Sequence, residues 1–214
     1  YRSLPALNLA CAGLGINAPV AAWTALAAGD VLAENAMKQL YELFRQAPTL
    51  GSLIDPTRVG GELFVAQFDK IRNLLSSALD AEKSEDSELA VVAQGLARAA
   101  TLLAERYTLV ATNVPYLARG NQAAVLAQHC DSHFNDAKTD LATCFIERCR
   151  SLLAPSGAAA LVTPQNWLSQ DHYASYRKRL LRDGRFELAG QLGPGAFSGI
   201  SGEVVKPLLI ILSG

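Results

Sequence analysis

The sequence has little charge and lacks the features that mark several classes of protein. Only 18% of its 214 residues are charged and the formal net charge is −1, so no global excess of basic residues indicates a nucleic-acid-binding protein. No apolar run reaches the roughly 18 residues that a membrane-spanning helix needs. The first residues also lack the basic-then-apolar pattern of a secretory signal. We therefore expect no membrane partner and a cytoplasmic location.

Paired cysteines and clusters of metal ligands are lacking as well. The cysteines form no CxxC pair and lie in apolar or helical patterns, which is typical of reduced thiols. They are Cys11, Cys130, Cys144 and Cys149. His129, Cys130 and His133 lie close together in the sequence, but no second pair of ligands accompanies them. We therefore expect no metal site there, and we interpret the segment as a polar loop or helix end.

In the first half of the chain, apolar periodicity predicts one strand followed by helices. Residues 7–12 (LNLACA) form a short apolar run that ends at Gly13, the pattern of a buried strand. Amphipathic helices are expected at 30–45, 61–80 and 88–106, with a charged turn at 81–88. Residues 31–106 are therefore predicted to be a helical insertion.

From Tyr107 the pattern changes to alternating strands and helices. Strands are expected at 107–113, 158–164, 186–192 and 204–212, the first of them buried. Helices are expected from Asp140, as N-cap, to a Pro155-Ser156-Gly157 turn, and at 171–182. This order predicts an open α/β sheet whose last strand is antiparallel to its neighbours.

The tetrapeptide Asn113-Val114-Pro115-Tyr116 directly follows the first of these strands, at the edge where open α/β sheets bind ligands. The exocyclic amine of a base is a poor nucleophile because its lone pair is delocalised into the ring. A site that methylates it must accept its protons, and an Asn oxygen with the next backbone carbonyl can supply two acceptors. Proline stiffens the loop, and an aromatic ring can stack on a flipped base. The tetrapeptide therefore fits methylation of an amine.

Asn113-Val114-Pro115-Tyr116 resembles the Asn-Pro-Pro-Tyr motif of amino-methyltransferases, with Val114 in place of the first proline. Residues 140–168 (DLATCFIERCRSLLAPSGAAALVTPQNWL) and 191–205 (QLGPGAFSGISGEVV) resemble segments that follow this motif in N6-adenine DNA methyltransferases. The similarity is to the large PglX-like methyltransferases of BREX phage-resistance systems and their Eco57I-like relatives. Residues 50–54 (LGSLI) are also similar to that group.

The resemblance implies a partial Rossmann-like class I methyltransferase sheet, with helices on both faces, an antiparallel last strand and a helical insertion. It divides the chain into a partial N-terminal core at 1–30, the insertion at 31–106 and the C-terminal core at 107–214. It also implies methyl transfer from S-adenosylmethionine to adenine N6 in DNA, in restriction–modification or phage defence. The implied partners are DNA and other subunits of the defence system.

The same resemblance assigns roles to individual residues. Asn113, Val114, Pro115 and Tyr116 are the implied catalytic residues. The implied substrate contacts are Tyr116, Asn121 and Trp167, although Trp167 fits a core aromatic equally well. Asn113 and Pro115 are the implied cofactor contacts. The family's main Gly-rich cofactor loop is not found, because Gly13-Leu14-Gly15 lacks a third glycine. We therefore expect a fragment of an enzyme that is inactive by itself.

Other functions stay open on these residues. Methyltransferases of the same fold that act on RNA or on protein glutamine use a similar loop, and Val114 could mark a decayed site in a non-catalytic DNA-binding module. A basic cluster near the C-terminus could face phosphates, although a solvated helix face is the favoured interpretation. This cluster is Arg177, Lys178, Arg179, Arg182 and Arg185.

Overall fold

The computed structural model describes residues 8–27, 29–58, 86–193 and 206–214. The chain divides into two compact units, Tyr1–Glu105 and Arg106–Gly214. The first unit groups residues 1–30 with the predicted insertion. The three-part organisation, with 1–30 as part of the methyltransferase core, stays a prediction.

The described part of the first unit is helical. Its elements are α1 (Val20–Ala25), α2 (Val31–Phe44), α3 (Ala47–Leu50), the short 3-10 helix η1 (Gly51–Leu53) and α5 (Asp86–Ala104). The predicted helices at 30–45 and 88–106 are confirmed as α2 and α5. The predicted helix at 61–80 lies outside the described residues. The predicted turn at 81–88 is wrong in its last three residues, because α5 already begins at Asp86.

The core of this unit surrounds Trp23, which is fully buried and donates a 2.7 Å hydrogen bond from Nε1 to the Met37 carbonyl oxygen.

The strand predicted at 7–12 is wrong. Residues 8–12 form no regular element, Leu7 lies outside the described residues, and the side chain of Leu9 is 71% exposed. A strand needs a neighbour for its backbone groups, and in the described residues of this unit no strand is present to pair with this segment.

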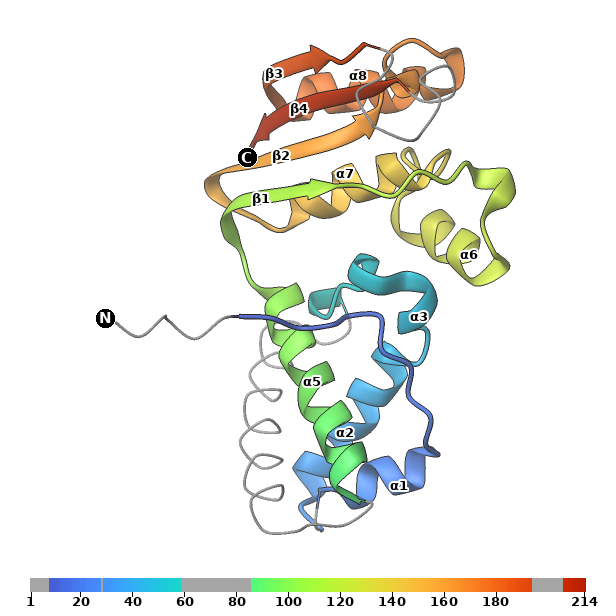
Figure 1. Cartoon of the computed structure of the whole chain (residues 1–214), viewed down its shortest axis with the longest axis vertical. Coiled ribbons are helices and arrows are strands. Elements are labelled where there is room, and N and C mark those ends of the chain that lie inside the picture. The colour runs from blue at the N-terminus through green and yellow to red at the C-terminus, as the bar shows by residue number, and fades with distance from the viewer. Residues whose placement is uncertain (1–7, 28, 59–85, 194–205) are drawn as a thin grey trace. The chain divides into compact units, whose positions relative to one another are not determined.

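The second unit is a mixed α/β unit. Its strands are β1 (Tyr107–Asn113), β2 (Leu153–Pro164), β3 (Arg185–Gln191) and β4 (Pro207–Ser213). Its α-helices are α6 (Ala124–His133), α7 (Leu141–Ser151) and α8 (Ala174–Asp183). Three 3-10 helices join them: η2 (Arg119–Asn121), η3 (Asn166–Leu168) and η4 (Asp171–Tyr173). Figure 1 shows the labelled strands and the helices beside them.

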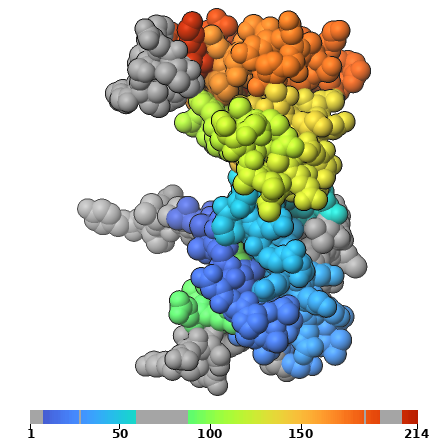
Figure 2. Space-filling view, turned by 90° about the vertical axis from the view of Figure 1, so that its right-hand side faces the viewer, coloured from blue at the N-terminus to red at the C-terminus, as the bar shows by residue number. Residues whose placement is uncertain are grey.

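The strand order is β1-β2-β4-β3, with β1 parallel to β2 and β4 antiparallel to both of its neighbours. The predicted α/β sheet with an antiparallel last strand is therefore confirmed. The first residues of the strand predicted at 204–212 lie outside the described residues. Helix α6 was not predicted; it lies on the surface in Figure 2 and buries only a narrow side, including Leu126 and Cys130.

Strand β2 is longer than expected, because Pro155-Ser156-Gly157 lies inside it and helix α7 ends earlier, at Ser151. Ser156 has a φ of 62°, and the pairing register with β1 shifts between Tyr107 and Leu109. A Cβ at Gly157 would stand 2.7 Å from the Tyr107 carbonyl oxygen. The predicted helix-ending turn is therefore an irregularity within the strand, where the close approach of β1 requires glycine.

One face of the sheet is covered. Its side chains are Ala159, Leu161, Thr163, Leu208, Ile210 and Leu212, and all are at most 2% exposed. Helix α7 packs on β2, and Tyr176 of α8 contacts Trp167, which bonds to Thr163 on this face. This face and its helices form the core of the unit.

The opposite face and the β1 edge are open, which differs from the prediction in two respects. Leu109, Leu188 and Leu209 on that face are 61%, 47% and 36% exposed, so helices on both faces are not seen among the described residues of this unit. Strand β1 is an edge strand whose residues are mostly exposed, so its predicted burial is wrong. Its apolar sequence suits a central strand, but in the described residues only β2 pairs with it.

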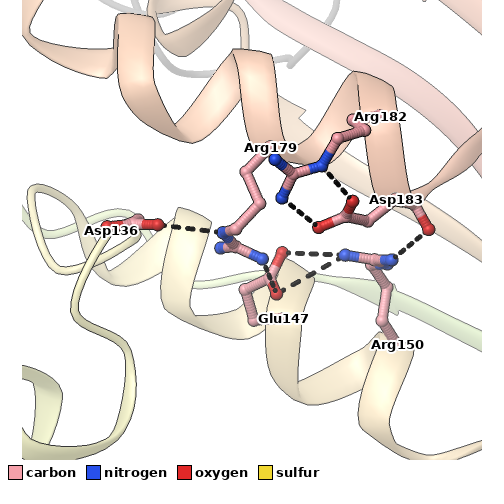
Figure 3. A network of polar contacts seen from close by, with 6 residues as sticks. All are labelled: Asp136, Glu147, Arg150, Arg179, Arg182 and Asp183. Atoms are coloured by element: carbon pink, nitrogen blue, oxygen red, sulfur yellow. Dashed lines mark hydrogen bonds and ion pairs between the residues drawn. The ribbon is translucent and has the colours of Figure 1, made fainter.

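A network of charged side chains joins α8 to α7 (Figure 3). Arg179 of α8 contacts Glu147 of α7 at 3.0 Å, and it contacts Asp136, before α7, at the same distance. Glu147 is also 3.3 Å from Arg150, which donates to the Asp183 carbonyl oxygen at 3.0 Å. The side chains of Glu147, Arg150 and Arg179 are only 17% to 27% exposed. Solvent therefore screens the attraction between these charges less than it would at a fully exposed surface.

The basic cluster of the sequence is therefore largely used within the unit. Arg179 belongs to this network, Arg182 pairs with Asp183, and Arg177 donates to the carbonyl oxygens of Trp167 and Gln170. Lys178 is exposed, and the side chain of Arg185 lies outside the described residues. The favoured interpretation of a simply solvated face is wrong for Arg177 and Arg179, because both side chains are only partly exposed and bound.

Glu147→Gln is expected to destabilise the chain. The substitution keeps the shape but removes the charge that two arginines share, and hydrogen bonds to charged groups contribute about 1.5–3 kcal/mol each. Urea unfolding should show the loss as a lower midpoint with an unchanged slope. Asp183→Asn is the matched control, because its ion pair with Arg182 is exposed and the backbone contact with Arg150 survives. Equal effects of the two variants would contradict a stabilising role for the network.

No helix in the described ranges is both long and apolar enough to cross a membrane.

Candidate functional site

The Asn113-Val114-Pro115-Tyr116 loop leaves the carboxyl end of β1 and folds back on itself. The hydroxyl of Tyr116 donates to Oδ1 of Asn113 at 3.4 Å, so the structure brings these two predicted residues together. Asn113 and Pro115 are exposed and Tyr116 is half-buried. Burial raises the pKa of Tyr116 above its usual 10, so its hydroxyl stays protonated at neutral pH and acts as a donor.

Val114 attaches the loop to the sheet. It is 2% exposed, and its backbone N–H donates to the Val162 carbonyl oxygen of β2 at 3.2 Å. A proline at this position would fix the backbone through its ring but could not donate this bond. At the position where the family motif has its first proline, the loop is therefore held by a hydrogen bond to the neighbouring strand.

A cavity of about 600 Å³ lies beside this loop. Its lining comes from the segments that follow β1 and β2, with Asp140 at the start of α7 and Lys206 before β4. The lining residues are Tyr116, Leu117, Ala118, Asn121, Asp140, Pro164, Gln165, Asn166, Ser169, Gln170 and Lys206. Because β1 and β2 are parallel, their carboxyl ends meet at one edge of the sheet, and the cavity opens there.

The predicted substrate residues divide between this cavity and the core. Tyr116 and Asn121 line the cavity. Trp167 does not: it is 1% exposed, donates from Nε1 to Thr163 Oγ1 at 3.2 Å and packs edge-on against Tyr176 at 6.0 Å. Trp167 is therefore a core side chain. Arg177 donates to the carbonyl oxygens of Trp167 and Gln170, which ties two residues of the 165–170 loop together.

The sequence did not predict six of the polar residues that line the cavity, four of which lie in the loop after β2. Gln165, Asn166, Ser169 and Gln170 present hydroxyl and amide groups, Asp140 a buried carboxylate and Lys206 an amine. The signal that could have found the loop is topological. A polar segment follows β2, the parallel neighbour of β1, so the carboxyl ends of both strands lie at the same edge of the sheet. The sequence indicates Asp140 as a helix cap and as the first residue of the family-like segment 140–168, but not as a residue of the cavity.

The alternative sites suggested by the sequence do not assemble. Gly13 and Gly15 lie in an irregular segment and follow no strand. His129 and His133 stack on α6 with ring centroids 4.3 Å apart, and no group of three or more His, Cys, Asp or Glu in the described ranges is placed to hold a metal ion. All four cysteines are free thiols; Cys11 is exposed and the others are buried.

Comparison with known proteins places the chain among methylases. The model of the Eco57I restriction-modification methylase family matches residues 34–193. The chain is 32% identical over 183 residues to the adenine-specific methyltransferase BrxX of Escherichia coli O9:H4 (strain HS), covering 86% of this chain and 15% of that protein. It is 29% identical over 119 residues to the adenine-specific methyltransferase PglX of Lacticaseibacillus casei (strain Zhang), covering 56% of this chain and 10% of that protein.

Among solved structures, a Listeria monocytogenes protein described as a class I S-adenosylmethionine-dependent methyltransferase aligns with a TM-score of 0.42 and 15% identity, covering 67% of this chain and 50% of that chain. The chain thus spans between a tenth and a sixth of the length of the two curated relatives. The family model covers most of the described elements, from α2 to the end of β3. The chain belongs to the Eco57I restriction-modification methylase family.

Proposed function

We propose that this chain is part of an adenine-specific DNA methyltransferase that transfers a methyl group from S-adenosylmethionine to adenine N6. The observation that carries the proposal is the pairing of Asn113 with Tyr116 at the carboxyl end of β1, directly beside a cavity lined with amide groups. A hydrogen-bond acceptor and an aromatic face at one point are what an extruded base with an exocyclic amine requires.

In this proposal Asn113 Oδ1 and the Val114 carbonyl oxygen accept the two hydrogens of the adenine amine. As the nitrogen–carbon bond forms and the carbon–sulfur bond breaks, the nitrogen gains positive charge, and both acceptors stabilise it before its proton leaves to solvent. The ring of Tyr116 stacks on the base. Asn121 and Gln165 line the cavity, and in this proposal their amide groups bond the edge of the adenine.

S-adenosylmethionine, when bound, supplies an electrophilic methyl group on a sulfonium. Of the described residues, Asn113 and Pro115 are the ones proposed to contact it, and both are exposed. No Gly-rich turn between a strand and a helix occurs in the described ranges. That the 214-residue chain binds the cofactor weakly and is inactive by itself stays a prediction, which calorimetry with S-adenosylmethionine tests.

The proposed setting is restriction–modification or phage defence in the cytoplasm, with DNA and other defence-system subunits as partners. The family description supports the restriction–modification setting, and the names of both relatives support adenine as the methylated base. Transfer to RNA or to protein glutamine, and a non-catalytic DNA-binding module, are the alternatives that an assay must separate.

The test is transfer of labelled methyl from S-adenosylmethionine by the full-length protein, offered DNA, RNA and protein in parallel. The expected product is N6-methyladenine in DNA, identified by mass spectrometry of the nucleosides. Label in RNA or glutamine would establish the alternative substrate. Tight DNA binding without any transfer would establish the binding module and overturn the proposal.

Val114→Pro, which restores the family residue, is expected to lower stability slightly and to keep turnover. Proline removes the N–H that bonds to Val162, which costs about 1 kcal/mol, while the carbonyl oxygen used as acceptor remains. Thermal unfolding and single-turnover methylation should be measured on the same preparation. Turnover that falls with unchanged stability would show that the Val114 N–H, and not its carbonyl, matters for the reaction.

A further inference from the structure

Asp140 is the buried carboxylate of the cavity. It is 6% exposed, and within the described ranges no Lys, Arg or His side chain forms an ion pair with it. Its charge is instead stabilised by the amino end of α7, where Oδ1 accepts a 2.8 Å bond from the Ala142 N–H. This charge also acts on Tyr173, whose pKa is raised to about 12, first by burial and then by Asp140.

The same oxygen also reaches a second segment. Asp140 Oδ1 accepts a 3.4 Å bond from the Leu117 N–H, from a residue 23 positions earlier in the chain. Leu117 is the residue directly after Tyr116. One carboxylate oxygen therefore bonds both to its own helix and to the end of the loop that carries Asn113 and Tyr116.

Backbone bonds continue this junction on both sides. The Leu141 N–H donates to the Leu117 carbonyl oxygen at 2.9 Å, and the Arg119 N–H donates to the Thr139 carbonyl oxygen at 3.0 Å. Ala118 and Asp140 form an isolated antiparallel bridge between them. Residues 117–119 are thus joined to residues 139–141 along their whole length, and we call this junction the loop clip.

We propose that Asp140 is a positioning residue, which fixes the loop clip and thereby holds the ring of Tyr116 at the cavity. This role rests on the proposed function, because it concerns the residue that would stack on the base. A helix cap alone does not account for the geometry. Asp30, the cap of α2, accepts only from Leu32 and Ala33, both local to its own helix.

Three variants of the full-length protein separate the clip from the cap. Asp140→Ser keeps a good helix cap, but its side chain is one bond shorter and cannot also reach the Leu117 N–H. Asp140→Asn keeps an oxygen acceptor at the same distance. Asp30→Ser makes the same chemical change at the cap of α2, a helix of the other compact unit.

Two measurements report on the position of Tyr116. The first is the single-turnover methylation rate at saturating DNA and cofactor. The second is the fluorescence of 2-aminopurine placed at the target adenine, which responds to stacking of the extruded base. A role in folding alone would leave the emission of the bound base unchanged.

Asp140→Ser is expected to lower the rate about tenfold and to change the emission of the bound base. A misplacement of about 1 Å can cost about 100-fold in rate, and the loss of one bond at the loop clip should shift Tyr116 by less than that. Asp140→Asn should restore most of both signals, and Asp30→Ser should leave both unchanged. Wild-type rate and emission in Asp140→Ser, with an intact thermal transition, would overturn the positioning role. If Asn113→Ala is also fully active, the proposed function itself fails, so the two failures are distinct.

Discussion

Asn113→Ala in the full-length protein is expected to lower the single-turnover methylation rate about 100- to 1000-fold, the usual cost of removing one preorganised hydrogen-bond partner of a reacting group. Asn113 is the last residue of β1, so the strand holds its backbone, and its side-chain oxygen accepts a long 3.4 Å bond from the Tyr116 hydroxyl. It therefore needs no rearrangement to accept a proton of the amine. The substitution leaves the aromatic face and the cavity intact, so DNA affinity should change little.

Thr108→Ala is the control for this variant. Thr108 is exposed on the same strand, at the opposite end from the loop, and it does not line the cavity. Substituting Thr108 should reproduce any effect on the stability of β1 while the Asn113 oxygen stays in place. Near-normal turnover in Asn113→Ala would mean that the tetrapeptide is a structural turn and that the site lies elsewhere.

Tyr116→Ala is expected to weaken capture of the extruded base by about 1–3 kcal/mol, the usual contribution of stacking between a base and an aromatic ring. That corresponds to a loss of roughly 5- to 150-fold. The substitution also removes the long 3.4 Å bond from the hydroxyl to Asn113, a weak restraint on the asparagine amide whose loss adds only a small decrease in rate. We therefore expect both the affinity for target DNA and the rate to fall, whereas Asn113→Ala should affect mainly the rate.

Tyr116→Phe divides these two contributions. It keeps the ring face and loses only the 3.4 Å bond to Asn113, which is long and therefore weak. Affinity for DNA should stay near that of the wild type, with a small loss of rate. Binding should be titrated against DNA with and without the target adenine at fixed salt, because phosphate contacts add a term that depends on ionic strength. An equal loss in both DNAs would show that Tyr116 does not touch the base.

Local patterns in the sequence predicted most of the sheet unit correctly. The strand at 107–113, the Asp140 cap and the antiparallel last strand follow from apolar runs, a capping residue and strand order. These features depend on neighbours within a few residues, or on topology rules that apply to any open α/β sheet. The tetrapeptide could be placed at the carboxyl end of a strand for the same reason.

The features that were not predicted depend on contacts distant in sequence. The apolar run at 7–12 has the composition of a strand, yet composition cannot supply a partner for its backbone. Trp167 fitted a pocket wall or a core position equally well, and only the packing of Tyr176 and Phe186 around it decides for the core. Asp140 accepts from Ala142, two residues later, and from Leu117, 23 residues earlier. A local pattern predicts the first of these bonds, but no local pattern marks the second.

The two tryptophans of the chain, Trp23 and Trp167, give each compact unit its own spectroscopic reporter. Both are sealed from solvent, at 0% and 1% exposure, so each should emit at short wavelength when folded and shift to the red when its unit opens. With Trp167→Phe the emission follows the helical unit, and with Trp23→Phe it follows the sheet unit. Coincident denaturation curves would show that the units unfold as one cooperative system, and separate curves would give each unit a stability of its own.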